Sequence, residues 1–372
     1  MAVGFPVKDD YVTGDVLTAA NMNDLSGTLN TLSGAASTVN KNYLINGGFA
    51  VAQRGTSFTS GANNDDAYTL DRWYILSDGN DAIDVTQETT TVPTNGEFAI
   101  ALDVETVNKK FGIATIIENK DVIGLVGNTV TFSFKAKVSA TTKLDNVKAA
   151  IVAWSGTADT VTSDIISAWG AEGTNPTLIA NATYENTPAN LSLTTSYASY
   201  SITAAVDTAS TQNIILFIWS DVTDTTLGDF LYIAESKLEL GSIATPFEYA
   251  GGTFQGELAA CQRYFQKIGG ESNMAMATGG ATAAGAGNLF VRFPVVFRTA
   301  PSFAFGGTLS TDFLILTAGG GSAGAPTALT QGVGGTTSSR IDFSGVSGLT
   351  AGYVTGVQCS NTNANLQFSA EL

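Results

Sequence analysis

Short runs of alternating apolar and polar residues, separated by turn signals, recur through most of this sequence. The runs at 130–138 and 196–202 alternate, and the run at 214–219 is apolar and equally short, so each predicts a strand of about 5 to 9 residues. Turn signals rich in glycine and asparagine separate the runs, at 46–48, 78–80, 94–96, 126–128 and within the polar stretch 171–188. Because no long helical pattern intervenes, the sequence predicts an all-β fold, most simply a jelly-roll β-sandwich over 42–250.

A second module is predicted after residue 250. Leu258, Cys261 and Phe265 lie at helical spacing, which predicts a short helix or turn near its start. Between residues 270 and 372 only seven side chains are formally charged, and glycine clusters separate candidate strands at 289–293, 313–316 and 353–357. We therefore predict that 251–372 forms a second β-sandwich domain with long, neutral loops.

Residues 1–41 have a different pattern. Thr18 is a candidate N-cap, and apolar residues follow it at alternating spacings of three and four: Met22, Leu25, Leu29, Leu32, Ala36 and Val39. This spacing predicts a short N-terminal helix whose apolar seam either forms a coiled coil between chains, and so an oligomerisation element, or packs on the chain's own β domain. A glycine in each repeat costs about 1 kcal/mol of helix stability relative to alanine, so the seam needs a partner.

The charge balance narrows the range of partners. The sequence has 17 basic and 33 acidic residues, a formal net charge of −16. Such a chain is repelled by phosphate backbones and anionic membranes, so nucleic acid is not an expected partner. The sequence also lacks an apolar stretch of about 18 residues and the basic and apolar regions of a secretory signal, so we expect neither membrane insertion nor secretion.

Histidine is absent from the sequence. This absence excludes Ser-His-Asp and Cys-His nucleophilic systems and histidine-ligated metals. The two cysteines, Cys261 and Cys359, have no second ligand at metal spacing and are predicted to be buried, reduced thiols. A glycosidase built on paired carboxylates is still conceivable, but its candidate pairs are explained more simply as turn formers, a solvated face or isolated cation ligands: Asp65/Asp66, Asp78/Asp81 and Glu235/Glu239. We predict a protein that is not an enzyme and has no cofactor other than an optional calcium ion.

Calcium and sugar each have candidate residues. Asp65, Asp66 and Asp71 lie in or near a loop rich in Asn and Asp whose oxygen atoms suit a calcium ion, although the spacing is not that of an EF-hand. Trp169 lies beside the polar stretch and is a candidate platform for stacking against a sugar ring. Trp219 lies inside an apolar run and is predicted to be core.

A glycine-rich loop is the other candidate for ligand binding. It contains Gly319, Gly320, Gly321 and Ser322, and the surrounding segment 317–339 is uncharged. Glycine allows a ligand to approach the backbone closely, so we predict that recognition lies in the loops at 317–335. The alternative is that these glycines form tight turns or a contact between chains.

Several motifs resemble those of one group of virion proteins. NYLINGGF at 42–49, QRGTSF at 53–58 and DRW at 71–73 resemble the opening of a carbohydrate-binding-module-like jelly roll common in bacteriophage tail-fibre proteins. VTFSFKAK at 130–137, AESKLELG at 234–241 and ATPFE at 244–248 are similar to its later parts. ELAACQRYFQK at 257–267 and VRFPVVFRTAPS at 291–302 are similar to the group's C-terminal domain, and GDVLTAANMN at 14–23 to the attachment segments of tail proteins. In physical terms Arg54 and Arg72 suit carboxylate partners and Trp73 suits a core, so these residues specify a fold rather than a binding site.

The resemblance implies a non-catalytic bacteriophage virion protein of tail-fibre type, assembled in the host cytoplasm and most simply a homotrimer. It implies that residues 1–41 attach to another virion protein and that the distal β domain binds a glycan or a protein on the host cell surface. The alternative is a capsid decoration or head-fibre protein with a structural or weakly adhesive role.

Overall fold

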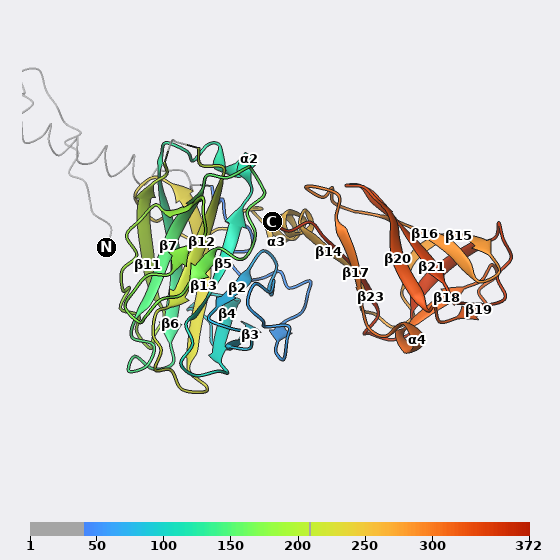
Figure 1. Cartoon of the computed structure of the whole chain (residues 1–372), viewed down its shortest axis with the longest axis horizontal. Coiled ribbons are helices and arrows are strands. Elements are labelled where there is room, and N and C mark those ends of the chain that lie inside the picture. Colours follow the sequence, from blue (N-terminus) through green and yellow to red (C-terminus); the bar gives the residue numbers. More distant parts are fainter. Residues whose placement is uncertain (1–40, 208–209) are drawn as a thin grey trace, which may run out of the picture. The chain divides into compact units, whose positions relative to one another are not determined.

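The computed structural model describes residues 41–207 and 210–372, and the sheets in these ranges are antiparallel (Figure 1). The all-β class predicted from the alternating runs is confirmed. The first sandwich has a six-stranded sheet, in the order β1-β3-β4-β13-β6-β11, and a five-stranded sheet, in the order β10-β7-β12-β5-β2. Its strands are β1 (Ser57–Phe58), β2 (Tyr74–Ser77), β3 (Ile83–Glu88), β4 (Ala99–Val104), β5 (Phe111–Ile117), β6 (Thr129–Val138), β7 (Val147–Trp154), β10 (Ala182–Tyr184), β11 (Ala198–Ala205), β12 (Asn213–Ser220) and β13 (Phe230–Leu240), with the short helix α2 (Asn119–Val122) between β5 and β6.

The core of this sandwich lies between its two sheets, because each strand turns alternate apolar side chains inward. In β6, Phe132 and Phe134 are buried in that core, whereas Lys135 and Lys137 alternate with the inward positions and face outward. The predicted runs at 130–138, 196–202 and 214–219 correspond to β6, β11 and β12. The alternation therefore fixes which side chains reach the outer face of the six-stranded sheet.

The five-stranded sheet is apolar on both faces. On its outer face the rings of Phe217 and Trp219 stack with their centroids 4.5 Å apart, and both side chains are fully buried. The segment that contains the hairpin of β8 (Ile166–Ala168) and β9 (Thr177–Leu178) covers this face, with Val161 and Ile165 buried against it. Trp219 is thus core, as predicted, and the cover leaves no open platform over these two rings.

After β13 the chain forms helix α3 (Phe254–Gln262) and then two further sheets. The predicted short helix is confirmed at Leu258 and Cys261, but Phe265, the third residue of the predicted spacing, begins a strand instead. Their strand orders are β14-β23-β17 and β19-β18-β22-β15-β16-β21-β20. Phe368 from the smaller sheet shares one buried core with Ile341 and Val357 from the larger sheet, which confirms a second β-sandwich. The elements are β14 (Phe265–Gly269), β15 (Ala275–Ala283), β16 (Ala286–Arg292), β17 (Ser302–Gly306), α4 (Leu309–Asp312), β18 (Phe313–Leu316), β19 (Ser322–Gly324), β20 (Ala328–Gly334), β21 (Ser338–Ser344), β22 (Val354–Cys359) and β23 (Asn365–Ser369).

The chain divides into residues 1–40 and one compact unit, 41–372. The domain boundary predicted between 250 and 251 therefore stays a prediction. The predicted helix with its apolar seam from Met22 to Val39 lies outside the described residues. No helix in the described ranges is long and apolar enough to cross a membrane, and Cys261 and Cys359 are both buried and free.

Candidate functional site

The turn at 46–48 is joined by hydrogen bonds to neighbouring segments of the first sandwich, including the motif at 71–73. Asn46 adopts a positive φ of 58°, and its side-chain amide donates hydrogen bonds to the carbonyl oxygens of Val51 and Asp71 at 2.9 and 2.8 Å. The Trp73 indole in turn donates to the Asn46 carbonyl at 3.0 Å. A Cβ atom on Gly47 would overlap the Ser236 carbonyl oxygen, so glycine is required where this turn meets β13.

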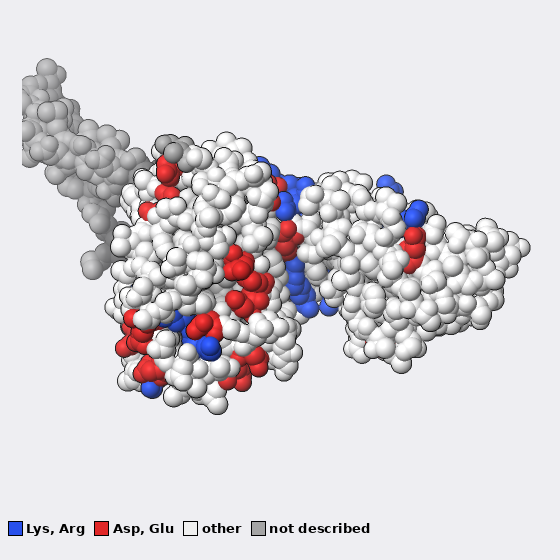
Figure 2. Space-filling model, viewed as in Figure 1, with Lys and Arg blue, Asp and Glu red and all other residues white. Residues whose placement is uncertain are grey.

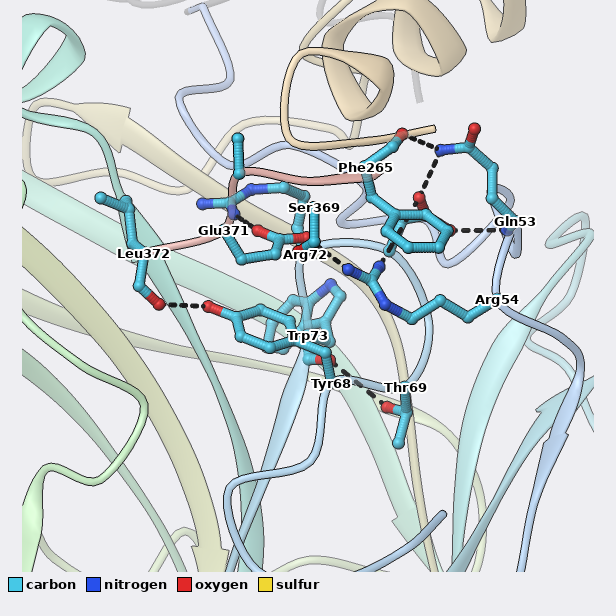
Figure 3. Close-up of polar contacts among 12 residues, drawn as sticks. Gln53, Arg54, Tyr68, Thr69, Arg72, Trp73, Phe265, Ser369, Glu371 and Leu372 are labelled. Carbon is cyan, nitrogen blue, oxygen red and sulfur yellow. Dashed lines mark hydrogen bonds and ion pairs between the residues drawn. The ribbon is translucent and has the colours of Figure 1, made fainter. Parts of the chain in front are cut away.

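Arg54 and Arg72 form a buried ionic cluster with Glu371, which we call the arginine junction (Figure 3). The guanidinium of Arg72 lies 3.7 Å from the ring centroid of Tyr264, and that of Arg54 lies 3.7 Å from the ring centroid of Phe265. These contacts add a cation–π attraction to the ion pairs. The predicted carboxylate partners of both arginines are thus confirmed, and the motifs at 53–58, 71–73 and 257–267 meet in one cluster.

Two further carboxylates stabilise the region around the junction. Asp71 accepts hydrogen bonds from the main chain and side chain of Gln53 at 2.7 and 2.6 Å. Burial raises the pKa of Asp71, and the charge of Arg54 offsets part of that rise. Glu118 accepts from Arg263 and Tyr264 at 2.7 Å each. Burial would raise the pKa of Glu118, but these hydrogen bonds outweigh it and lower the pKa to about 2. The carboxylates of Asp71, Glu118 and Glu371 are all engaged by protein groups, whereas Arg54 Nη1 has no hydrogen-bond partner and lies 4.0 Å from Asp71 Oδ1. We interpret the junction as structural.

A pocket of about 420 Å³ in the first sandwich is the best candidate for a binding site. We call it the acidic pocket, because three carboxylates share its lining with three aromatic rings. Its lining residues are Gly48, Asn95, Gly96, Glu97, Phe98, Glu235, Phe247, Glu248, Tyr249 and Gly252. A few polar groups around an aromatic lining are typical of sites for small ligands.

Glu235 reaches the pocket because β13 is irregular at this point. The register of β13 against β6 shifts between Ala234 and Lys237, and Glu235 has a positive φ of 48°. Such a bulge redirects a side chain that the regular alternation would place elsewhere. Lys135 on β6 pairs with the Glu235 carboxylate at 2.8 Å, so this carboxylate is held in place.

The aromatic wall of the pocket is anchored by a buried ion pair. Lys237 and Glu239 are 3.5 Å apart and almost fully buried. The Lys237 ammonium donates to the Pro246 carbonyl oxygen at 2.9 Å, and Glu239 accepts from the Thr245 amide at 2.8 Å. The segment just before Phe247 is therefore fixed by two charged side chains of β13.

The rings of this wall pack directly on the turn at 46–48. Phe247 and Tyr249 meet edge to face with centroids 5.5 Å apart. A Cβ atom on Gly48 would lie 3.0 Å from each ring, so glycine allows both rings to approach the backbone. Burial raises the pKa of Tyr249, and the charges of Glu97 and Glu257 raise it further. The Tyr249 hydroxyl therefore stays protonated and can donate a hydrogen bond.

The pocket combines features that suit a sugar. Half-exposed rings can cover the apolar face of a pyranose, and carboxylates accept hydrogen bonds from hydroxyl groups. Figure 2 shows acidic side chains gathered on the visible face of the first sandwich, whereas the second sandwich shows few charges on its visible face. The three carboxylates of the acidic pocket would repel an anionic ligand, whereas a neutral or cationic sugar would not be repelled.

The structure places the sequence-predicted sugar candidates elsewhere. Trp169 is half-buried and packs edge-on against Phe217 at 6.0 Å, as part of the cover over the five-stranded sheet. The residues Gly319, Gly320, Gly321 and Ser322 lie exposed where β18 turns into β19, and Gly319 and Gly320 have positive φ angles of 92° and 84°. Both sites stay predictions, and neither contributes to the acidic pocket.

The three calcium candidates do not come together. Asp71 belongs to the hydrogen-bonded surroundings of the arginine junction, whereas the Asp65 carboxylate accepts from the Ser77 amide at 2.7 Å. Burial, followed by the charges of Asp65 and Asp164, raises the pKa of Asp66 to about 7. Within the described residues no group of three or more acidic, cysteine or histidine side chains is arranged to hold a metal ion.

Sequence reasoning missed the pocket because its walls come from separate segments. The signals present were the turn at 94–96, the ATPFE motif at 244–248 and the pair Glu235/Glu239. In the structure Glu235 lines the pocket, whereas Glu239 is buried behind the wall. The segments that line the pocket are far apart in the sequence and show no regular spacing that would indicate that they share a pocket.

No protein-family model matches the sequence, and no curated protein sequence does so either. Solved structures that resemble the chain include the enzymatically active domain of tailspike protein 4 from bacteriophage CBA120, at 16% identity and a TM-score of 0.33 over 54% of this chain and 21% of that chain. Another is TmCBM61 in complex with β-1,4-galactotriose, at 15% identity and a TM-score of 0.28 over 54% of this chain and 99% of that one. A third is the CBM22-1 xylan-binding domain of Paenibacillus barcinonensis Xyn10C, at 11% identity and a TM-score of 0.29 over 49% and 94%.

Proposed function

We propose that this protein is a non-catalytic bacteriophage virion appendage of tail-fibre type that binds a glycan on the host cell surface. The observation that carries the proposal is the acidic pocket, where the rings of Phe98, Phe247 and Tyr249 surround a cavity large enough for a sugar unit. The wall of the pocket is fixed by Lys237 and Glu239, so little order is lost when a ligand binds.

The assignment to a virion rests on the resemblance of the motifs. The arginine junction supports it, because the motifs at 53–58, 71–73 and 257–267, which carry the resemblance, meet there. The homotrimer, and attachment to another virion protein through residues 1–41, are part of the proposal. A capsid decoration or head-fibre protein is the alternative. Antibody labelling of intact virions distinguishes the two, because label at the tail supports a tail fibre and label over the capsid supports the alternative.

We expect the pocket to bind a glycan without hydrolysing it. A glycosidase needs one carboxyl group as acid and another as nucleophile or base, and the Glu235 carboxylate is already engaged by Lys135. Incubation with host surface polysaccharide should release no reducing ends. Release that a single change such as Glu97→Gln or Glu248→Gln abolishes would contradict this part of the proposal.

A glycan array tests the binding itself. The intact protein is expected to bind at least one neutral or amino-sugar glycan, and Phe247→Ala should weaken that binding about tenfold, because a ring that covers the sugar is lost. The matched control is Tyr353→Ala, which removes a ring that is 60% exposed and does not line the pocket. Deletion of 319–324 tests the alternative site. Loss of binding on this deletion but not in Phe247→Ala would move recognition to the glycine-rich loop.

A further inference from the structure

The outer face of the six-stranded sheet carries a second group of rings beside the acidic pocket. Phe230 and Tyr232 on β13 alternate with the core residues Leu231 and Ile233, so they face outward. Their rings stack with centroids 5.4 Å apart and planes inclined by 15°. Both side chains are half-buried, which leaves part of each ring exposed.

A lysine and a tyrosine border these two rings. The ammonium of Lys137 lies 5.2 Å from the ring centroid of Tyr232 and 5.9 Å from that of Tyr197. The Tyr197 hydroxyl donates to the Thr91 carbonyl oxygen at 2.9 Å, which fixes that ring. On the other side Tyr232 is paired with Ala101 of β4, whose side chain is buried. We call the group formed by Phe230, Tyr232, Lys137 and Tyr197 the β13 platform.

The platform and the acidic pocket lie on the same face of the same sheet. Lys135 and Lys137 are two residues apart on β6, so their side chains point to one side of the sheet. Lys135 pairs with Glu235 of the pocket, and Lys137 lies over Tyr232 of the platform. The step between the two lysines is about 7 Å along the strand. A ligand that fills the pocket and continues along β13 therefore meets the platform next.

We propose that the acidic pocket and the β13 platform form one continuous track for an unbranched oligosaccharide without acidic groups. This inference rests on the proposed function and adds the length and charge of the ligand to it. The pocket holds one end of the chain between Phe98, Phe247 and Tyr249. The following sugar units lie on the exposed parts of Tyr232 and Phe230, and Lys137 donates hydrogen bonds to their hydroxyl groups.

The charges along the track define the class of sugar. Glu97, Glu235 and Glu248 line the pocket, and Asp103 stands opposite Phe230 on β4. Lys135 and Lys137 are the two cations placed against the track by the contacts described above, and Lys135 is neutralised by Glu235. A chain of uronic acids or of sulfated sugars would be repelled, whereas neutral or amino-sugar chains would not.

The test uses the full chain and immobilised oligosaccharides from mono- to hexasaccharide, built from glucose, galactose, glucosamine or glucuronic acid. Wild-type affinity for at least one neutral or amino-sugar series should rise with chain length, and the glucuronic acid series should not bind. Tyr232→Ala should lower the affinity for the longest chain about tenfold and leave the shortest bound member unchanged. Tyr232→Phe should retain the rise with length because the ring remains. Phe247→Ala should weaken every length alike.

Control variants and outcomes separate this inference from the proposed function. Tyr353→Ala is the control for loss of an exposed ring, and the unfolding transition of each variant verifies its fold. A flat length series in the wild type, or a Tyr232→Ala variant that keeps the full rise with length, would overturn the track while the pocket stands. Stronger binding to the glucuronic acid series would overturn the assigned sugar class. If the wild type binds no member of any series, the proposed glycan function fails, and the track fails with it.

Discussion

Replacement of Glu371 by glutamine should destabilise the protein more than any change to a surface ion pair. The Arg72 and Glu371 side chains are only 2% and 7% exposed, so Glu371→Gln leaves a buried guanidinium without its counter-charge. Removal of one partner from a buried pair costs about 3–5 kcal/mol. We expect the lower end of this range, about 3 kcal/mol, because Arg72 keeps its hydrogen bond to the Ile116 carbonyl and its contact with the Tyr264 ring.

Urea unfolding followed by tryptophan fluorescence measures this loss in the free energy of unfolding. The matched control is Asp342→Asn, which breaks a pair with Arg340 whose side chains are 36% and 35% exposed, and it should cost less than about 1 kcal/mol. The double variant Arg72→Met with Glu371→Leu should lie closer to wild type than Glu371→Gln, because the most deeply buried guanidinium, that of Arg72, is removed together with its partner. Arg54 loses Glu371 in both variants and keeps Asp71 at 4.0 Å. The reasoning is refuted if Glu371→Gln costs no more than Asp342→Asn.

Three further predictions concern the pocket, the pH response and assembly. Gly48→Ala should displace the rings of Phe247 and Tyr249 and weaken glycan binding, measured on the same array, because the new Cβ atom lies 3.0 Å from each ring; unchanged affinity would remove this contact from the site. Burial, followed by neighbouring carboxylates, raises the pKa of Asp103 to about 6, so its folded form binds the proton more tightly than the unfolded form. The wild type should therefore gain stability relative to Asp103→Asn as the pH falls from about 7 to about 4, and parallel urea midpoints across that range would contradict this. Leu29→Asp should place a charge in the predicted apolar seam and weaken the homotrimer in light scattering, whereas a wild-type monomer at micromolar concentration would contradict the assembly itself.

Sequence patterns predicted the strands well because burial on one face imposes a period that is visible along the chain. The alternation at 130–138 predicted β6, and the run at 214–219 predicted β12 with Trp219 in the core. The need of Arg54 and Arg72 for carboxylate partners was also predictable from their charge. The identity of the partner was not, because Glu371 lies about 300 residues further along the chain and no local pattern links it to them.

The acidic pocket depends on features that have no sequence period. Glu235 reaches it through a bulge in β13, and Phe247 and Tyr249 reach it because Gly48 leaves room for their rings. Trp169 had the expected chemistry for a sugar platform, but the segment around it folds back over the five-stranded sheet, where its ring packs on Phe217. Composition indicates which side chains suit a ligand, and only tertiary packing decides which of them are left available.

A crystal structure of the full chain with an oligosaccharide that it binds on the array would locate the sugar-binding site. We expect a sugar ring in the acidic pocket, in contact with Phe247 and Tyr249, and further units that continue along β13 towards Tyr232. An oligosaccharide bound instead at the exposed turn of Gly319 to Ser322, with the acidic pocket unoccupied, would contradict the assignment of glycan binding to the acidic pocket.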